Sequence, residues 1–225
     1  MADPPGFERE IILTAGQVEL PGHLAIPDRA AGVVIFAHGS GSSRRSPRNR
    51  FVAAALNQAG VGTLLAYLLT PGEELSRANV FDVRLLAARL TDITRWLQRH
   101  PGARDLPVGY FGASTGAAAA LWAAAAPRMP IAAIVSRGGR PDLAGPQLAL
   151  VRSPTLLIIG SNDETVLRLN RQAQQQLMCE SKLTVIPGAS HLFAEPGALE
   201  QVADLAISWF TRHLVPQAAR SVPPP

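Results

Sequence analysis

Apolar residues in this chain fall into two patterns that take turns from residue 32 onward. Short continuous apolar runs are typical of strands buried on both faces of a parallel sheet. Longer segments with apolar residues every three or four positions are typical of helices that cover such a sheet. The predicted strands are 32–37, 61–69, 106–111, 129–135, 155–159 and 183–186, and the predicted helices are 50–59, 81–100, 117–126, 166–178 and 197–214.

The chain before residue 32 predicts a different unit, a two-stranded hairpin. Its strands are 11–15 and 17–26, and Pro21-Gly22 interrupts the second strand. Residues 1–10 are polar, and we expect them to be loosely held. A hairpin followed by a regular alternation of strand and helix predicts an α/β fold with a mainly parallel sheet and helices on both faces.

The size of the chain suits one domain, which we place over residues 1–215. It has 225 residues, of which 47% are hydrophobic, enough for a single core of α/β type. No segment is long enough for a large cap domain, and only the loops after residues 69 and 136 are candidates for a partial cover. The proline-rich stretch 216–225 is expected to be a disordered tail.

Composition narrows the possible partners and the compartment. The net charge of +4 comes from scattered arginines and one lysine without a basic run interleaved with aromatics, so no nucleic-acid partner is expected. No apolar run approaches the roughly 20 residues that a membrane span needs, and the first residues lack a signal-peptide pattern. The single cysteine, Cys179, excludes an internal disulfide framework and fits a reducing compartment, so we expect a cytoplasmic protein.

One motif stands between a predicted strand and the most helix-prone segment of the chain. Gly112-Ala113-Ser114-Thr115-Gly116 reads Gly-x-Ser-x-Gly, which in this context is typical of a nucleophile elbow. In so tight a turn the serine backbone is strained, and side chains two positions either side would collide. The following helix directs its first N–H groups and its positive end toward the serine. The alternative is an ordinary glycine-rich loop between a strand and a helix.

A serine hydroxyl needs a base to remove its proton and a carboxylate to orient that base. Ser114, Asp163 and His191 each follow a predicted strand, so all three belong at the carboxyl ends of the sheet. Their order along the chain is also the one that such sheets use for catalytic triads. Taken alone, Asp163 is equally explained as a helix N-cap, and His191 as a structural loop histidine.

An oxyanion formed at this serine would need two N–H donors. We assign the backbone N–H of Thr115 as one donor and that of Ser40, in the small-residue loop 38–43, as the other. The same loop has an alternative interpretation as a phosphate-binding loop. That interpretation is weak, because no Gly-Lys-Ser/Thr follows.

These motifs together resemble the α/β-hydrolase superfamily. The matching segments are His38-Gly39, 112–116, 160–166 and 188–193, and the size and the missing cap look most like the dienelactone hydrolase-like branch. The resemblance implies an eight-stranded sheet, a Ser/Cys–His–Asp triad and no cofactor. Dienelactone hydrolases proper use a cysteine nucleophile, whereas this chain has Ser114 there, which favours a serine esterase. Some similar bacterial chains carry an appended phosphoribosyltransferase domain, for which these 225 residues leave no room.

The substrate is only broadly indicated. An open site without a lid favours small or short-acyl esters. Arg137 and Arg140 follow a strand's carboxyl end and are the candidates for binding a carboxylate or phosphate on the substrate, with Arg44 and Arg45 as further candidates. The alternative, which we weight more heavily, is that these arginines are solvated or paired with Asp82 or Asp142.

The sequence therefore predicts a cofactor-free carboxylesterase that forms an acyl-enzyme on a small-molecule ester. A lactonase or thioesterase with the same triad, or a catalytically silent ligand-binding protein on this fold, remain alternatives. Haloalkane and epoxide hydrolases need Asp where Ser114 stands. A metal hydrolase is disfavoured, because no two His or Cys residues stand at ligand spacing. The sequence leaves open whether the protein is a monomer or a homodimer.

Overall fold

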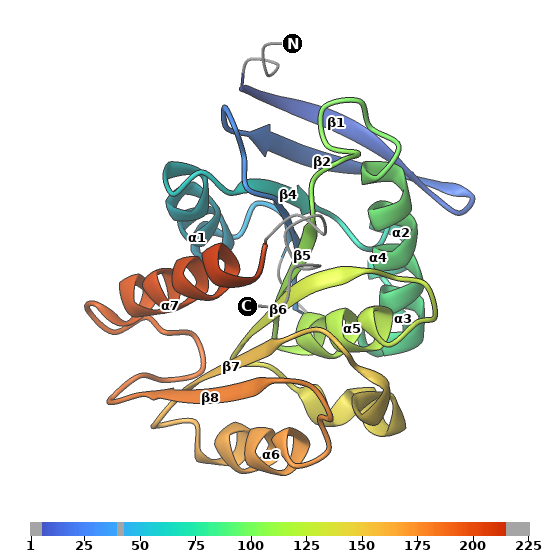
Figure 1. Cartoon of the computed structure of the whole chain (residues 1–225). Helices are drawn as coiled ribbons and strands as arrows, with labels where there is room; N and C mark the ends of the chain where they lie inside the picture. The colour runs from blue at the N-terminus through green and yellow to red at the C-terminus, as the bar shows by residue number, and fades with distance from the viewer. Residues whose placement is uncertain (1–5, 40–42, 215–225) are drawn as a thin grey trace, which may run out of the picture.

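A computed structural model describes residues 6–39 and 43–214 of the chain. Its centre is one eight-stranded sheet in the order β1-β2-β4-β3-β5-β6-β7-β8 (Figure 1). The strands are β1 (Phe7–Ala15), β2 (Val18–Ile26), β3 (Val33–Ala37), β4 (Gly62–Ala66), β5 (Val108–Ala113), β6 (Ile131–Arg137), β7 (Thr155–Gly160) and β8 (Ser181–Ile186). The β1–β2 and β2–β4 pairs are antiparallel and all the others are parallel. The predicted mainly parallel sheet with an N-terminal hairpin is confirmed.

Helices cover both faces of this sheet, as the alternation predicted (Figure 1). One face carries α1 (Pro47–Gln58) and α7 (Ala198–His213), which lie side by side. The other face carries α4 (Val83–Leu97), α5 (Thr115–Ala124), the 3₁₀ segment η1 (Pro141–Leu150) and α6 (Glu164–Gln174). No large cap domain covers the sheet within the part of the chain that the structure describes.

The central strands are apolar throughout because each of their faces meets a layer of helices. All five residues of β3 are buried. Val33 and Ile35 belong to the core under α4 and α5, whereas Val34 and Phe36 belong to the core under α1 and α7. Full burial of such a side chain contributes about 1.5–3 kcal/mol, so the two cores together hold the layers in place.

A buried polar link ties α4 to the strand that leads into the Ser motif. Tyr110 in β5 is fully buried, and its hydroxyl lies 2.7 Å from Thr94 Oγ1 of α4. The Thr94 hydroxyl donates to the Leu90 carbonyl at 2.8 Å, so the tyrosine is the donor in the first bond. Burial raises the pKa of Tyr110, which therefore stays protonated at neutral pH.

Several element boundaries differ from the sequence-based predictions, and specific contacts explain two of them. Residues 7–10 are not loose but belong to β1, because Phe7 pairs with Ile26 and its ring packs 5.9 Å from the His100 ring. Helix α1 begins at Pro47 rather than at residue 50, because Ser46 caps it.

The expected polar loop after residue 69 contains two short helices, α2 (Pro71–Glu74) and α3 (Arg77–Phe81). A reciprocal capping box between Thr70 and Glu73 stabilises the first of them. The predicted tail, 216–225, lies outside the described residues.

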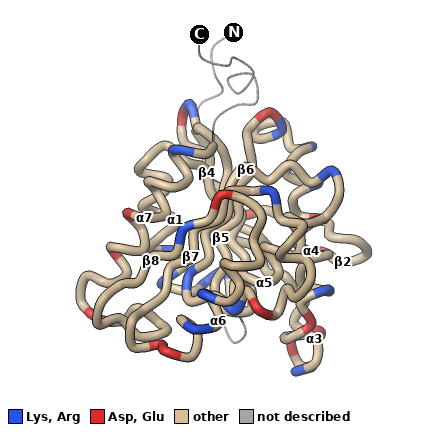
Figure 2. Tube along the Cα trace, turned by 60° about the horizontal axis from the view of Figure 1, so that its bottom comes forward, with Lys and Arg blue, Asp and Glu red and all other residues tan. Residues whose placement is uncertain are grey.

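Charged positions of both signs are spread over the whole trace rather than gathered on one side (Figure 2). None of the helices that the structure describes is long and apolar enough to cross a membrane.

Candidate active site

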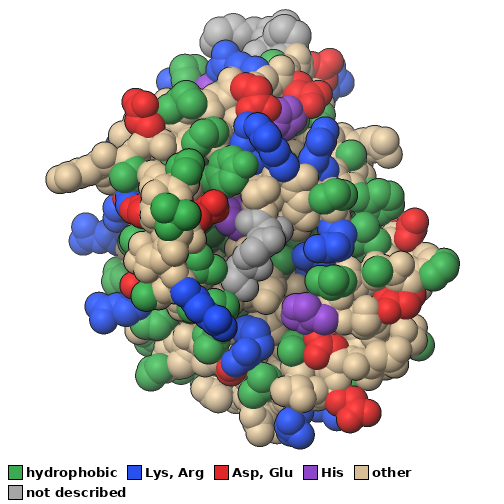
Figure 3. All heavy atoms as spheres, turned by 180° about the vertical axis from the view of Figure 1, so that it is seen from behind, with side chains coloured by type: hydrophobic (Ala, Val, Ile, Leu, Met, Phe, Trp, Pro, Cys, Tyr) green, Lys and Arg blue, Asp and Glu red, His purple; other side chains and the backbone are tan. Residues whose placement is uncertain are grey.

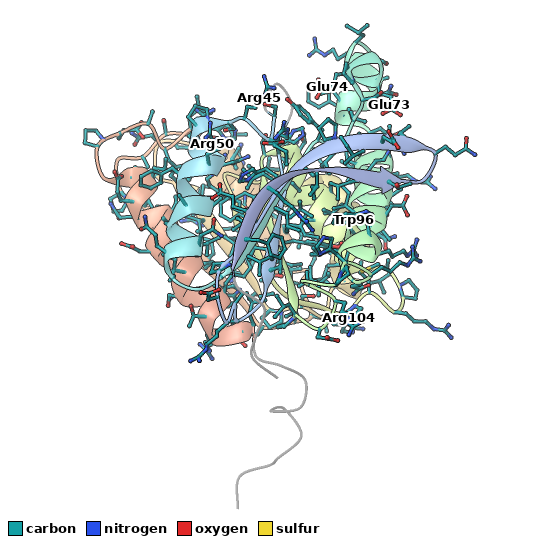
Figure 4. The ribbon with its side chains drawn as sticks, turned by 90° about the horizontal axis from the view of Figure 1, so that it is seen from above. Arg45, Arg50, Glu73, Glu74, Trp96 and Arg104 are labelled. Atoms are coloured by element: carbon teal, nitrogen blue, oxygen red, sulfur yellow. The ribbon has the colours of Figure 1, made fainter. Side chains whose placement is uncertain are left out.

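The carboxyl ends of the parallel strands meet at one end of the sheet. Figure 4 shows Arg45, which follows β3, and Glu74, which follows β4, at this end, whereas Arg104, which precedes β5, lies at the opposite end. The same end faces the viewer in Figure 3, where several basic side chains lie around the middle of the face. Each of the predicted site residues follows or ends one of these strands.

Ser114 joins β5 to α5 in a strained backbone conformation. Its φ of 51° and ψ of −123° lie in a region that non-glycine residues rarely adopt. A Cβ at Gly112 would lie 2.4 Å from Ala117 Cα, and one at Gly116 would lie 2.1 Å from the Ala37 carbonyl oxygen. Both positions therefore require glycine, which is the physical reason for the Gly-x-Ser-x-Gly spacing.

The loop after β3 lies directly against this serine. A Cβ at Gly39 would be 2.8 Å from Ser114 Cβ, so only a glycine backbone fits there. His38 is buried, and its Nδ1 lies 3.2 Å from the Gly39 carbonyl oxygen. Burial lowers the pKa of His38, so the neutral ring donates its Nδ1–H to that carbonyl. Of the two predicted oxyanion donors, Thr115 begins α5, whereas Ser40 lies outside the described residues.

Asp163 and His191, from the loops after β7 and β8, lie side by side. Asp163 Oδ2 is 2.6 Å from His191 Nδ1. Asp163 occupies the N-cap position of α6, yet its side chain makes no capping hydrogen bond. The carboxylate therefore faces the imidazole rather than the helix, which removes the evidence for the N-cap alternative.

A second set of contacts fixes these two loops to each other. Asn162 Nδ2 donates to the Gly188 carbonyl at 2.8 Å, and the Gly188 N–H donates to Ser161 Oγ at 2.8 Å. Gly188 has a φ of 73°, which favours glycine. Hydrogen bonds from the loop after β7 therefore hold the loop that carries His191 in place.

The segment after β6 connects Ser114 to His191. The Ser114 N–H donates to the Arg137 carbonyl at 3.4 Å. A Cβ at Gly138 would lie 3.5 Å from His191 Cε1, so the imidazole sits against the residue that follows Arg137. Among the described contacts, no hydrogen bond joins Ser114 Oγ to His191 Nε2. Catalytic hydrogen bonds are often long without substrate, and donation of the Nδ1 proton to Asp163 leaves Nε2 as an acceptor.

The predicted substrate-binding arginines have different environments. Arg140 donates to both carboxylate oxygens of Asp142, at 2.9 and 2.8 Å. This is the ion pair that the sequence analysis gave as the alternative to substrate binding. Arg44 likewise pairs with Glu10 at 2.7 Å. Arg137 differs from both, because no ion pair to a described carboxylate forms.

Arg137 is the last residue of β6 rather than part of the expected loop. It is only 8% exposed, and its Nε and Nη1 have no hydrogen-bond partner among the described residues. Burial and the neighbouring Arg48 lower the pKa of Arg137 to about 10. Sequence reasoning missed Arg48, because it placed the start of α1 at residue 50 and left Arg48 in a loop.

A cavity of about 620 Å³ opens between the loop after β3 and the segment after β4. It is lined by His38, Gly39, Ser43, Arg45, Ser46, Pro47, Arg48, Leu69, Glu74, Val80 and Leu86. Gly39 packs against Ser114, so the cavity adjoins the loop that lies against the candidate nucleophile. Its volume suits a small ligand.

Within residues 6–39 and 43–214, no group of three His, Cys, Asp or Glu side chains is placed to hold a metal ion. What the site offers is acid–base and nucleophilic chemistry: a hydroxyl on a strained turn and a carboxylate-oriented imidazole at the same end of the sheet.

Comparison with known proteins adds a family context. No protein-family model matches the chain. The crystal structure of a dienelactone hydrolase from Anabaena variabilis is 52% identical with a TM-score of 0.90, and the match covers 94% of this chain and 100% of that one. Est1E from Butyrivibrio proteoclasticus is 16% identical with a TM-score of 0.75 over 91% of this chain and 98% of that one, which shows the fold alone.

Among curated proteins, the chain is 60% identical over 213 residues to a Mycobacterium tuberculosis protein provisionally named a phosphoribosyl transferase. The match covers 95% of this chain but 48% of that protein. The chain thus spans about half the length of the curated relatives that it matches.

Proposed function

This chain belongs to the dienelactone hydrolase-like branch of the α/β-hydrolase superfamily, and from that premise we propose that it is a serine carboxylesterase for small or short-acyl esters. The observation that carries the proposal is the 2.6 Å bond between Asp163 and His191 at the end of the sheet where Ser114 is held at a φ of 51°. A strained serine beside an imidazole that a carboxylate orients is the arrangement that nucleophilic acyl transfer needs.

In the proposed first half-reaction, Ser114 Oγ attacks the ester carbonyl carbon while its proton passes to His191 Nε2. Asp163 keeps the Nδ1 proton in place and stabilises the imidazolium. The backbone N–H groups of Thr115 and Ser40 are the proposed donors to the oxyanion. When the tetrahedral intermediate collapses, the bond to the alcohol oxygen breaks, and that oxygen takes the proton from His191.

The second half-reaction releases the acyl group. Water attacks the acyl carbon as it passes a proton to His191 Nε2, and the bond between that carbon and Ser114 Oγ then breaks. The serine oxygen takes back the proton from the imidazole, which restores the starting state. No cofactor enters either half-reaction.

The same machinery would cleave a lactone or a thioester, so these remain the alternatives for the substrate. We propose no phosphoribosyl transferase activity for this chain, because about half of each Mycobacterium tuberculosis relative lies outside the match. A catalytically silent ligand-binding protein is the alternative from another class.

A panel of p-nitrophenyl esters, lactones and thioesters tests the proposal with three proteins: the unchanged chain, Ser114→Ala and Ser208→Ala. Ser208 is an exposed serine of α7 and serves as the matched control. We expect turnover of short-acyl esters by the unchanged chain and by Ser208→Ala, and near-complete loss in Ser114→Ala. Equal turnover by all three proteins would contradict the nucleophile assignment.

A further inference from the structure

The side chain of Arg137 is a buried cation without a counter-ion among the described residues. Its guanidinium carbon lies 6.0 Å from the centroid of the Phe193 ring, which is a favourable contact. Buried arginines are costly unless they are paired and hydrogen-bonded. A ligand that binds this charge would offset the free-energy cost of burying it.

Arg48 brings a second cation to the same place. It lies in the first turn of α1, a helix of 12 residues that shares one core with Phe193, the ring that Arg137 contacts. The two guanidiniums therefore lie on the same side of the sheet, in line with the part that the Arg48 charge has in lowering the pKa of Arg137. Arg48 Nε is also buried without a hydrogen-bond partner among the described residues. The first turn of α1 contains no acidic residue, so the helix N-terminus adds a further partial positive charge.

Nearby acids do not neutralise this pair. Asp142 is bonded to Arg140, Glu10 is paired with Arg44, and Asp163 is bonded to His191. Neither Arg48 nor Arg137 forms an ion pair with any carboxylate in the described part of the chain. Two cations and a helix N-terminus thus lie on the same side of the sheet, and Arg48 Nε and Arg137 Nε and Nη1 have no partner among the described residues.

We propose that Arg48 and Arg137 bind a phosphate group, so that the esters cleaved at this site carry a phosphate. The inference rests on the proposed function for its substrate half, and on the arginines alone for its binding half. Arg48 and Gly39 both line the 620 Å³ cavity, and Gly39 packs against Ser114. The proposal therefore puts the phosphate in this cavity and the ester carbonyl at Ser114, beside Gly39.

Phosphate fits this pair better than a carboxylate on grounds of charge and donors. A phosphate monoester carries nearly two negative charges at neutral pH and offers three oxygens. A carboxylate carries one charge and is satisfied by a single guanidinium in a bidentate pair. It would leave the second buried cation uncompensated.

A purely structural role for Arg137, packed against Phe193, is the competing explanation. That role predicts a change in stability on substitution but no change in anion binding. Measurement of binding, rather than of activity alone, therefore separates the two explanations.

Binding is tested with inorganic phosphate by isothermal titration calorimetry at pH 7.5 and low ionic strength, with acetate as the comparison anion. The variants are Arg137→Gln, Arg48→Gln and the control Arg50→Gln, which removes the same charge from the exposed side of α1 (Figure 4). We expect phosphate to bind more tightly than acetate. The dissociation constant for phosphate should rise at least about tenfold in the first two variants and less than about twofold in the control.

Phosphate that binds no more tightly than acetate would overturn the proposal. Equal weakening by Arg48→Gln and Arg50→Gln would also overturn it, because it would show only the general charge of the protein. If Arg137→Gln does not fold, Arg48→Gln carries the test, since Arg48 is only half-buried.

The substrate half is tested with two esters that differ only in a phosphate on the acyl part. The ratio of kcat/KM for the phosphorylated ester to that for the neutral ester should fall at least about tenfold in Arg48→Gln and stay constant in Arg50→Gln. A ratio unchanged in Arg48→Gln would contradict the substrate class. If neither ester is cleaved, the proposed function fails, while the calorimetric result still decides the phosphate site.

Discussion

The Nδ1 atom of His191 lies 2.6 Å from Oδ2 of Asp163, although the two residues are 28 positions apart in the chain. So short a contact between an imidazole and a carboxylate is a charge-assisted hydrogen bond. It fixes the tautomer of the ring and leaves Nε2 as the acceptor. The loops after β7 and β8 hold this pair at the carboxyl end of the sheet.

Replacement of Asp163 by Asn should abolish most of the activity without unfolding the protein. The amide accepts the Nδ1 proton poorly and favours the wrong tautomer, so kcat/KM should fall by about 10³–10⁴-fold. Ester hydrolysis and circular dichroism measure the two effects. Asp105→Asn, at an exposed position before β5, is the control and should leave kcat/KM unchanged. A loss of less than about tenfold in Asp163→Asn would show that His191 does not depend on this carboxylate.

Gly116→Ala should strongly destabilise the fold, because the new Cβ would lie 2.1 Å from the Ala37 carbonyl oxygen. Backbone atoms cannot yield cheaply, so we expect a loss of about 3 kcal/mol or more in the free energy of unfolding. Urea denaturation measures it. The control is Gly72→Ala in α2, where no atom lies within 4 Å of the new Cβ, and where the free energy should change by less than about 1 kcal/mol. Equal urea midpoints for the two variants would be inconsistent with the close approach of α5 to β3.

Tyr110→Phe should lower the free energy of unfolding by about 1–2 kcal/mol, because the hydroxyl of Thr94 loses a donor in a buried site. The ring stays, so packing against α4 is kept. We expect the combined variant Tyr110→Phe with Thr94→Val to lose less than the sum of the two single losses, since the residues are bonded to each other. Additive losses would show that the bond contributes nothing to stability.

Arg137→Met should make the ligand-free protein more stable, because it removes a buried charge to which the described part of the chain gives no counter-ion. Burial lowers the pKa of Arg137 to about 10 on folding, so we expect a gain of about 1–3 kcal/mol at pH 7. The sign of the pH dependence follows from linkage. Above about pH 10 the unfolded chain still holds a proton that the folded chain has lost, so the stability of the unchanged protein rises with pH there.

The variant lacks this titration, so its advantage should shrink above about pH 10. Chemical denaturation at pH 7, in phosphate-free buffer, measures the main effect. A large loss of stability in Arg137→Met would instead assign the guanidinium a structural role.

Burial on both faces is the feature that made the sheet predictable. The strand at 32–37 could be identified because every residue of β3 meets a core, and a strand of this kind has no polar positions. The spacing around Ser114 was predictable for a similar reason, since the collisions at Gly112 and Gly116 leave no other residue type. In both cases the packing restricts which residue types can stand at these positions, and that restriction is visible in the sequence.

Properties that depend on long-range contacts were not predictable. The strand character of residues 7–10 depends on Phe7 meeting Ile26 and His100, which are distant in the sequence. The position of Arg137 inside β6 depends on its pairing with Ala113 and Ile158. The predicted end of this strand at residue 135 was wrong, because the prediction could not include these pairings. The position of Arg48 and Arg137 on the same side of the sheet follows from the packing of α1, for which local sequence gives no signal.

The most direct test of the central proposal is covalent labelling with a fluorophosphonate, followed by peptide mass spectrometry. The reagent reacts with a serine only where a base activates the hydroxyl. We predict a stoichiometric adduct on Ser114, with labelling lost in Ser114→Ala and strongly slowed in His191→Ala. A protein that stays unlabelled, or one labelled equally well without His191, would contradict the serine hydrolase assignment.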